Sequence, residues 1–501
     1  MEIPTPTHAA LPTRSRRWRY LLLFIALVVV WQVVIALLPP TNHFLEDTSM
    51  SKKIAYAIGM PLLALLGVFC FQTAHATGLR QKADGKQQVL AQTEQSTAAQ
   101  ARTADDARQA FTLEVLGIGL SVPGMRDVTV WDAIEKTPRA LVLSTDSKDY
   151  PSGAREKQLV LMKWEADAVE HAASWFVEKW SIPVLAAGPV SSDPKEKDYL
   201  NDAVSSSTLS SAGMHWHQVQ TAGTLADDAP EALLTRAFDF FEQNPQAPAV
   251  ILYASDTLSI RGYLQAPGKP DLITDGDFKK SDLFGAVAAL VLVRRDRVDA
   301  LRPYAIDATT GLPAKQAGPA PAHPFQPSPW LPKPWTTLQL EQFDALPTLG
   351  YLHRPQTVST LDADKHPLPP KAKNEAFRQG WLDALRAMPP ATKVKRVFYD
   401  VGAPDQGGRI VPLAQTLATE TDLDALQAGQ GYNLTTNLAD TGAASPFVQI
   451  ALGLYASYRH NDVSASVNIK RNDSASIILI SPPLVKKAHP GGDPLGFGLA
   501  Q

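Results

Sequence analysis

A glycine-rich segment and a pair of histidines are the places in this 501-residue chain where residue types and spacing could support chemistry. Residues 117–124 read GIGLSVPG and follow an apolar strand, as a dinucleotide-binding loop does. The third glycine stands two positions too late for the G-x-G-x-x-G pattern, so we interpret the segment as a turn at the strand end. His215 and His217 flank Trp216 and could reach one metal ion from a strand, but no further ligands are arranged by spacing. We therefore predict no metal ligand, no cofactor-binding residue and no catalytic residue.

Cysteine chemistry has one candidate residue in the whole sequence. Cys70 is the single cysteine and lies in an apolar segment, which excludes an internal disulfide and a cysteine-based zinc site. No G-x-S-x-G, phosphate-binding P-loop or H-E-x-x-H motif occurs, so the commonest hydrolase, nucleotide-binding and zinc-protease classes are excluded. The formal net charge of −3 gives no electrostatic support for nucleic-acid binding. A divergent enzyme using residues such as Asp146, Asp256 or His215 stays open as an alternative.

Helical and strand patterns alternate along the region that would carry any site. This alternation predicts an α/β fold with a largely parallel sheet covered on both faces. In the first half we expect strands at 111–117, 140–144, 185–187, 249–255 and 286–293, and helices at 130–136, 164–180 and 229–243. In the second half we expect helices at 376–388, 414–426 and 446–458, and strands at 396–401, 464–469 and 476–481. Two successive halves of comparable size suggest an internal duplication.

The composition of the remaining segments suggests domain boundaries. We assign the two α/β halves to 111–302 and 371–485, joined by a proline-rich connection at 303–370. Residues 303–335 are too rich in proline for a helix or a central strand. A polyproline II partner site is the alternative reading of this stretch. Residues 77–110 are polar and lack an apolar stripe, so we expect a linker or stalk, and residues 486–501 are expected to form a flexible tail.

Two apolar segments precede the linker. Residues 20–38 read YLLLFIALVVVWQVVIALL, and as a helix they rise about 28 Å, close to the ~30 Å hydrocarbon core of a bilayer. The run is longer than the roughly 7–15 apolar residues of a signal peptide, and no small-residue cleavage site follows. Residues 54–71 form a second apolar stretch of similar length. We predict a two-helix transmembrane hairpin.

Basic residues near these segments predict the orientation of the hairpin. They are Arg14, Arg16, Arg17, Arg19, Lys52, Lys53, Arg80, Lys82 and Lys86. Seven of the nine lie on the inner side if residues 1–19 and the soluble region are both cytoplasmic. We therefore expect an inner-membrane protein with a cytoplasmic body. If the second segment does not cross, the body becomes periplasmic.

Three segments resemble the thiolase-like β-ketoacyl synthases. Residues 435–458 (TTNLADTGAASPFVQIALGLYASY) resemble their Gly-Ala-Ala turn and the apolar helix that follows. Residues 471–480 resemble their last strand pair, and residues 230–256 are similar to the helix and strand after their nucleophile. The resemblance implies a thiolase-like fold of two related halves. It does not imply condensation chemistry, because no cysteine follows Cys70 and Ala439 stands where these enzymes carry histidine.

A broader resemblance covers about residues 111–485. FTLEVLGIGLSVPGMRDVTVWDAI at 111–134, SDLFGAVAALVLVRRDRVDALRPYA at 281–305 and NDSASIILISPP at 472–483 resemble the type VI secretion lipase-adapter family. Such proteins hold a toxic phospholipase and deliver it to the secretion spike. The resemblance implies a non-enzymatic, membrane-anchored adapter with a phospholipase effector and a spike protein as partners, and no nucleic acid. A structural subunit of an inner-membrane complex is the second alternative.

Overall fold

The computed structural model describes most of the chain after residue 111. The described residues are 29–30, 33, 112–122, 124–136, 154–174, 176–177, 181–187, 215–221, 232–257, 285–314, 321, 323–389, 392–401, 408–438, 441, 444–487 and 494–495. Every element named below belongs to one compact unit, Asp105–Gln501. The predicted strand at 140–144 lies outside the described residues.

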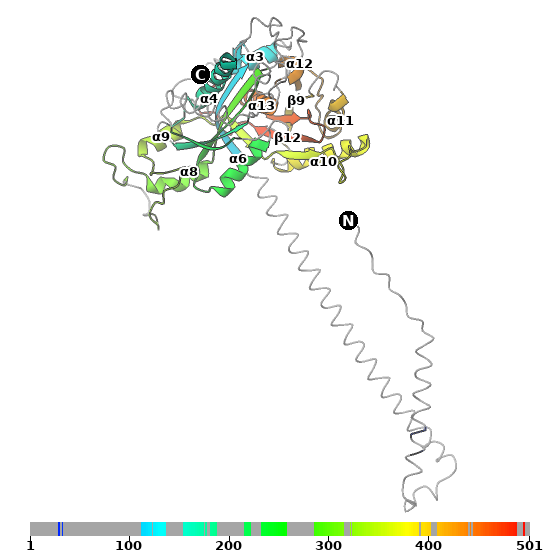
Figure 1. Ribbon diagram of the computed structural model, residues 1–501, viewed down its shortest axis with the longest axis horizontal. Coiled ribbons are helices and arrows are strands. Elements are labelled where there is room, and N and C mark those ends of the chain that lie inside the picture. The colour runs from blue at the N-terminus through cyan, green and yellow to red at the C-terminus, as the bar shows by residue number, and fades with distance from the viewer. Residues whose placement is uncertain are drawn as a thin grey trace, which may run out of the picture. The chain divides into compact units, whose positions relative to one another are not determined.

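A single mixed β-sheet runs through the described part of this unit (Figure 1). In the N-terminal half its strands are β1 (Thr112–Val122), β2 (Met125–Arg126), β3 (Ser181–Ala187), β4 (His215–Thr221), β5 (Ala249–Thr257) and β6 (Gly285–Val293). In the C-terminal half they are β7 (Gly350–His353), β8 (Gln356–Ser359), β9 (Val394–Asp400), β10 (Gly431–Asn433), β11 (Val463–Asn468) and β12 (Ser474–Ser481). The order is β10-β9-β11-β12-β7-β1-β6-β5-β3-β4, with β2 beside β1 and β8 beside β12.

The two halves of the sheet have the same topology. Each half places its main strands in the order third, second, fourth, fifth, first, as β4-β3-β5-β6-β1 and as β10-β9-β11-β12-β7. In each half the fifth strand is antiparallel to both neighbours, while the second strand is parallel to the third and fourth. The halves join where β1 pairs antiparallel with β7, from Thr112↔His353 to Val115↔Gly350. The mixed α/β fold is therefore confirmed.

The sheet is less parallel than the sequence analysis predicted. Strand β12 follows β11 after a short turn, and a parallel pair would require a crossover of about a dozen residues or more. The two strands therefore form an antiparallel hairpin, from Ser464↔Ile480 to Asn468↔Ser476. The strand β6 is antiparallel to β5 as well.

Helices form a central layer and two outer layers. They are α3 (Val128–Lys136), α4 (Ala154–Ala173), α6 (Ala232–Gln243), α8 (Arg295–Leu301), α9 (Thr337–Ala345), α10 (Pro370–Arg386), α11 (Val411–Glu420), α12 (Leu434–Leu438) and α13 (Ser445–His460). A central hydrophobic core holds α3, α6 and α13 against one face of each half of the sheet. A second core packs α4, α8 and α9 on the outer face of the N-terminal half, and a third packs α10 and α11 on that of the C-terminal half. Figure 1 shows α10 alongside β12, with which it is in contact.

The strands and helices follow from their residue patterns. Along β5, Val250 and Leu252 belong to the central core while Ile251 and Tyr253 belong to the outer core, as the two-residue period of a strand requires. Helix α13 is buried from Ser445 to Tyr458 and has no polar face, which is the pattern of an enclosed helix. A proline in its first turn and Asn461 in the left-handed conformation at its end set its limits.

Three sequence interpretations need correction. Gly117 and Gly119 lie inside strand β1, so the predicted strand-end turn is wrong there, and the chain reverses instead near Gly124, whose φ is +80°. The predicted connection 303–370 includes helix α9 and the strands β7 and β8, so the C-terminal half begins with β7 and not at 371. The expected flexible tail contains Leu495, which is 4% exposed and belongs to the central core.

The predicted membrane hairpin is not among the described elements. In the ranges that the structure describes, no helix has the length and apolarity needed to cross a bilayer. Of the segments 1–19, 20–38, 54–71 and 77–110, only Val29, Val30 and Val33 are described, and these three are helical and exposed. The two spans stay a prediction.

Candidate functional site

The residues singled out from sequence do not converge on one site in the described structure. His215 and His217 begin strand β4, opposite Ser181 and Pro183 of β3, so their expected place in a strand is confirmed. Asp256 lies in β5. The side chains of these three residues lie outside the described part of the chain, as do Asp146 and Ala439 entirely. Among described side chains, one group of three potential metal ligands occurs, the exposed Asp362, Asp364 and His366, which reasoning from the sequence did not identify.

A buried carboxylate lies at the carboxyl end of β9, the end of a parallel sheet where ligands usually bind. Asp400 is fully buried and accepts hydrogen bonds from Thr435 Oγ1 and Ser445 Oγ, each at 2.5 Å. Lys470 Nζ lies 3.8 Å from Asp400 Oδ2. Thr435 belongs to α12 and Ser445 begins α13, so the carboxylate ties both helices to the sheet. We interpret this network as structural.

The N-terminal half contains a second buried carboxylate, on helix α4. Ser255 Oγ of β5 donates a hydrogen bond of 2.5 Å to Glu165 Oε1. The other carboxylate oxygen, Glu165 Oε2, has no hydrogen-bond partner among the described residues. Burial raises the pKa of Glu165 to about 7, against a weaker lowering by the Ser255 hydrogen bond. This carboxyl group therefore changes charge near neutral pH.

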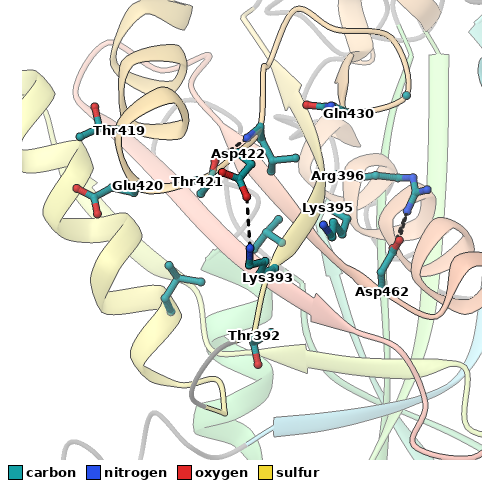
Figure 2. Close-up of a pocket in the computed structure, with 14 residues that line it drawn as sticks. Thr392, Lys393, Lys395, Arg396, Thr419, Glu420, Thr421, Asp422, Gln430 and Asp462 are labelled. Carbon is teal, nitrogen blue, oxygen red and sulfur yellow. Dashed lines mark hydrogen bonds and ion pairs between the residues drawn. The ribbon is translucent and has the colours of Figure 1, made fainter.

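The clearest open site is a surface pocket in the C-terminal half (Figure 2). The end of α10, the start of β9, the end of α11 and the residues just before β10 and β11 form its walls. Its volume is about 540 Å³, within the usual range of ligand pockets. Its charged lining residues are Lys393, Lys395, Arg396, Glu420, Asp422 and Asp462.

Ion pairs engage every carboxylate that lines this pocket. Arg396 Nη1 lies 2.6 Å from Asp462 Oδ1, in a pair that is mostly shielded from solvent. Lys393 Nζ lies 3.3 Å from Asp422 Oδ2, where both side chains are well exposed. Arg378 Nη1, from α10, lies 2.9 Å from Glu420 Oε1. Figure 2 shows Lys395 between Lys393 and Arg396 without a bond to any residue drawn. This set of groups can bind an anion by charge.

Two family models match the chain, one for each half of the sheet. Residues 111–275 match the model described as "Type VI lipase adapter protein Tla3, N-terminal". Residues 349–482 match "Type VI lipase adapter protein Tla3, C-terminal", a range that begins next to β7 and ends next to β12. The chain belongs to the type VI lipase adapter family. The resemblance to this family that the sequence analysis described is therefore confirmed, and the matches extend over both α/β halves.

Solved structures similar to this adapter include several ketosynthases. "The ishigamide ketosynthase/chain length factor" is 13% identical, with 74% of this chain and 99% of that chain covered and a TM-score of 0.46. A ketosynthase from module 6 of the bacillaene synthase of Bacillus subtilis 168 is 10% identical, with 74% and 72% covered and a TM-score of 0.44. The 3-oxoacyl-[acyl-carrier-protein] synthase III of Aquifex aeolicus VF5 is 11% identical, with 74% and 99% covered and a TM-score of 0.35.

Reasoning from the sequence missed the pocket of this adapter. The run Lys393–Arg396 reads Lys-Val-Lys-Arg and includes the first three residues of strand β9, so its pattern is that of an ordinary strand start. The sequence did offer one indication, three basic residues within four positions. What turns them into a site is the position of α11 and of the residues before β10, which sequence patterns do not give.

Proposed function

We propose that this chain is a membrane-anchored adapter that binds a phospholipase effector as a folded partner and delivers it to the type VI secretion spike. The observation that carries the proposal is the match of both halves to the type VI lipase adapter models. A body of two fused α/β halves can readily offer about 800 Å² to a partner, the usual area per side of a stable interface.

Binding is favoured over catalysis by the residues at the carboxyl ends of the strands. Asp400 there accepts hydrogen bonds from two hydroxyls that begin helices, which is a structural use of a buried carboxylate. The sequence offers no cysteine after Cys70, and a thiolate is the nucleophile of the condensing enzymes that it resembles. A fold shared with enzymes does not by itself bring their activity.

Anchoring in the inner membrane is the second part of the proposal. The apolar segments 20–38 and 54–71 each have about the length of a bilayer span, and the flanking basic residues favour a cytoplasmic body. Such an anchor would keep the lipase in the producing cell at the membrane until it is loaded onto the spike. The spike protein is then the third partner, after the lipase and the inner membrane.

The test is binding of the full chain, in mild detergent, to the lipase encoded nearest to it. We expect co-elution on size exclusion and a dissociation constant of about 1 μM or tighter, which corresponds to about −8 kcal/mol. An unrelated lipase of similar size serves as the control and should elute separately. Failure to bind any lipase encoded in the same genome, or phospholipase activity of the chain alone, would contradict the proposal.

A further inference from the structure

We infer that the pocket around Lys395 receives an acidic side chain of the lipase partner, and this inference rests on the proposed function. The pocket combines three observations that do not depend on one another: a bulge in β9 at Lys395, an ammonium group with no charge partner among the described residues, and walls held by hydrogen bonds. Each points to a preformed anion site on a protein-binding surface.

Lys395 stands outside the hydrogen-bonded ladders of the sheet. Strand β9 pairs with β11 at Val394↔Val463 and then at Arg396↔Ser464, so Lys395 is the extra residue of a bulge. On the other side, β10 begins only opposite Val397. Lys395 therefore has no ladder partner on either side. Bulges bend a strand and re-aim its side chains, and they are frequent at binding sites.

The charge balance of the pocket favours an anion. The carboxylates of Glu420, Asp422 and Asp462 each face a cation already. Lys395 is exposed, and no ion pair joins it to any residue within the described ranges. An incoming cation would have to displace an existing partner, whereas an incoming carboxylate meets Lys395 directly. The neighbouring pair of Lys393 and Asp422 is exposed and therefore weak, so Lys393 is available as a second contact.

The walls of the pocket are held in place before any partner arrives. Val397 N donates to Gln430 O at 2.7 Å, and Asp424 N donates to Gln430 Oε1 at 2.8 Å. Gly431 packs so closely that an added Cβ would stand 1.8 Å from the Ala425 carbonyl oxygen. A preformed site loses little conformational entropy on binding, which favours affinity.

A protein side chain is the occupant that the surroundings fit best. Leu426, which lies in the chain between the lining residues Leu423 and Gly429, is 74% exposed, and Leu426 N donates a 2.8 Å hydrogen bond to Asp424 Oδ1. An exposed leucine beside a charged pocket offers apolar contact to a partner surface. It offers little to a small, free anion. Interfaces of stable complexes combine apolar contacts with such polar groups at the rim.

The experiment compares four forms of the full chain for affinity to the lipase encoded nearest to it. We expect Lys395→Glu to weaken binding at least about tenfold, or about 1.4 kcal/mol, and Lys395→Arg to bind within about threefold of the unchanged chain. Lys371→Glu makes the same charge change at the far end of α10, roughly 21 Å along the helix from the Leu385 wall of the pocket, and should bind normally. Matching melting temperatures will show that all four forms are folded.

The outcomes separate this inference from the proposed function. If the unchanged chain fails to bind the lipase, the proposed function and this inference both fail. If the unchanged chain and Lys395→Glu bind equally well, the adapter function stands and this inference is wrong, because the pocket then serves some other ligand. A lipase with one acidic surface residue changed to lysine should bind Lys395→Glu more tightly than it binds the unchanged chain. A scan of the lipase's surface acidic residues that yields no such reversal would also overturn the inference.

Discussion

Gly119 of strand β1 lies directly against the backbone of Ala168 in helix α4. A Cβ added at Gly119 would stand 1.7 Å from the Ala168 carbonyl oxygen, and one added at Gly117 would stand 1.8 Å from that of Ala172. Two glycines at alternate positions of the strand thus let the helix backbone approach the sheet along one turn. This close contact fixes the position of helix α4 on the outer face of the N-terminal half of the sheet.

Replacing Gly119 by alanine should therefore destabilise the protein. The helix must shift because its backbone carbonyl cannot yield, and we expect the free energy of unfolding to fall by about 3 kcal/mol. Denaturant unfolding measures this loss. Gly408→Ala is the control, because among the described residues no atom beyond its chain neighbours lies within 4 Å of the added Cβ, and it should change the stability by less than about 0.5 kcal/mol. Equal stabilities for the two variants would contradict the close packing.

The buried Glu165 should make stability depend on pH around neutrality. Burial raises the pKa of Glu165 from 4.5 to about 7 in the folded state, so the folded protein holds this proton over a range where the unfolded chain has lost it. The free energy of unfolding therefore decreases as pH rises from about 4.5 to about 7, by about 3 kcal/mol, and this contribution is constant above that range.

Glu165→Gln isolates this contribution. Glutamine keeps an oxygen that can accept the hydrogen bond from Ser255 and has no charge to bury. We expect the variant to gain stability relative to the unchanged chain as pH rises from about 5 to about 8. Glu170→Gln changes an exposed carboxyl on the same helix and should show no such gain. A constant difference across this pH range would show that Glu165 is charged in the folded state throughout.

Removing the Ser445 hydroxyl should lower the stability of the protein, because the buried Asp400 carboxylate then accepts one hydrogen bond fewer. Ser445→Ala leaves Asp400 with one hydroxyl donor fewer in a fully buried position, and we expect a loss of about 2 kcal/mol of stability. Ser174→Ala removes an exposed hydroxyl that donates to the His171 carbonyl oxygen, and it should cost less than about 0.5 kcal/mol. Thermal unfolding of both variants decides the comparison, and an unchanged Ser445→Ala midpoint would refute the structural role.

Reporter fusions test the proposed membrane topology. A phosphatase fused after residue 501 should be inactive and a green fluorescent protein at the same place should be bright, since seven of nine flanking basic residues favour a cytoplasmic body. A phosphatase inserted in the loop at 39–53 is the matched control and should be active. Strong phosphatase activity at residue 501 would place the body in the periplasm instead.

Elements built on long continuous apolar runs were predicted well from the sequence. The helix expected at 446–458 is α13, and the strands expected at 249–255 and 286–293 are β5 and β6, because continuous apolar runs bounded by turn residues leave few alternatives. Helix α4 begins at Ala154, ten residues before the predicted start at 164, and the prediction missed its first turns because four of the first five residues are polar. The start of the C-terminal half was misplaced because β7 has only four residues beside a proline-rich stretch.

The candidate site could not be predicted from the sequence because it depends on the register in which strand β9 pairs with β11. The sequence shows Lys393, Lys395 and Arg396 as three neighbouring cations. The structure separates them: Arg396 pairs with Asp462, Lys393 with Asp422, and Lys395 occupies the bulge. A shift of one residue in the pairing of β9 with β11 would exchange these environments. Such a difference leaves no trace in composition or periodicity.

The central position of β1 has a consequence for synthesis of the protein on the ribosome. This strand is made first, yet it lies between β6 and β7, and its Glu114 accepts hydrogen bonds from Arg295 and Thr348, which follow it by 181 and 234 residues. At about 5–20 residues per second, translation reaches Thr348 roughly 12–47 s after Glu114. Gly285, where β6 begins, follows Glu114 by 171 residues, so for roughly the first 9–34 s of that delay neither β6 nor β7 has been made, and the late, non-local pairing of this apolar 11-residue strand slows folding. A nascent chain of this protein therefore needs protection from aggregation until its second half begins to emerge.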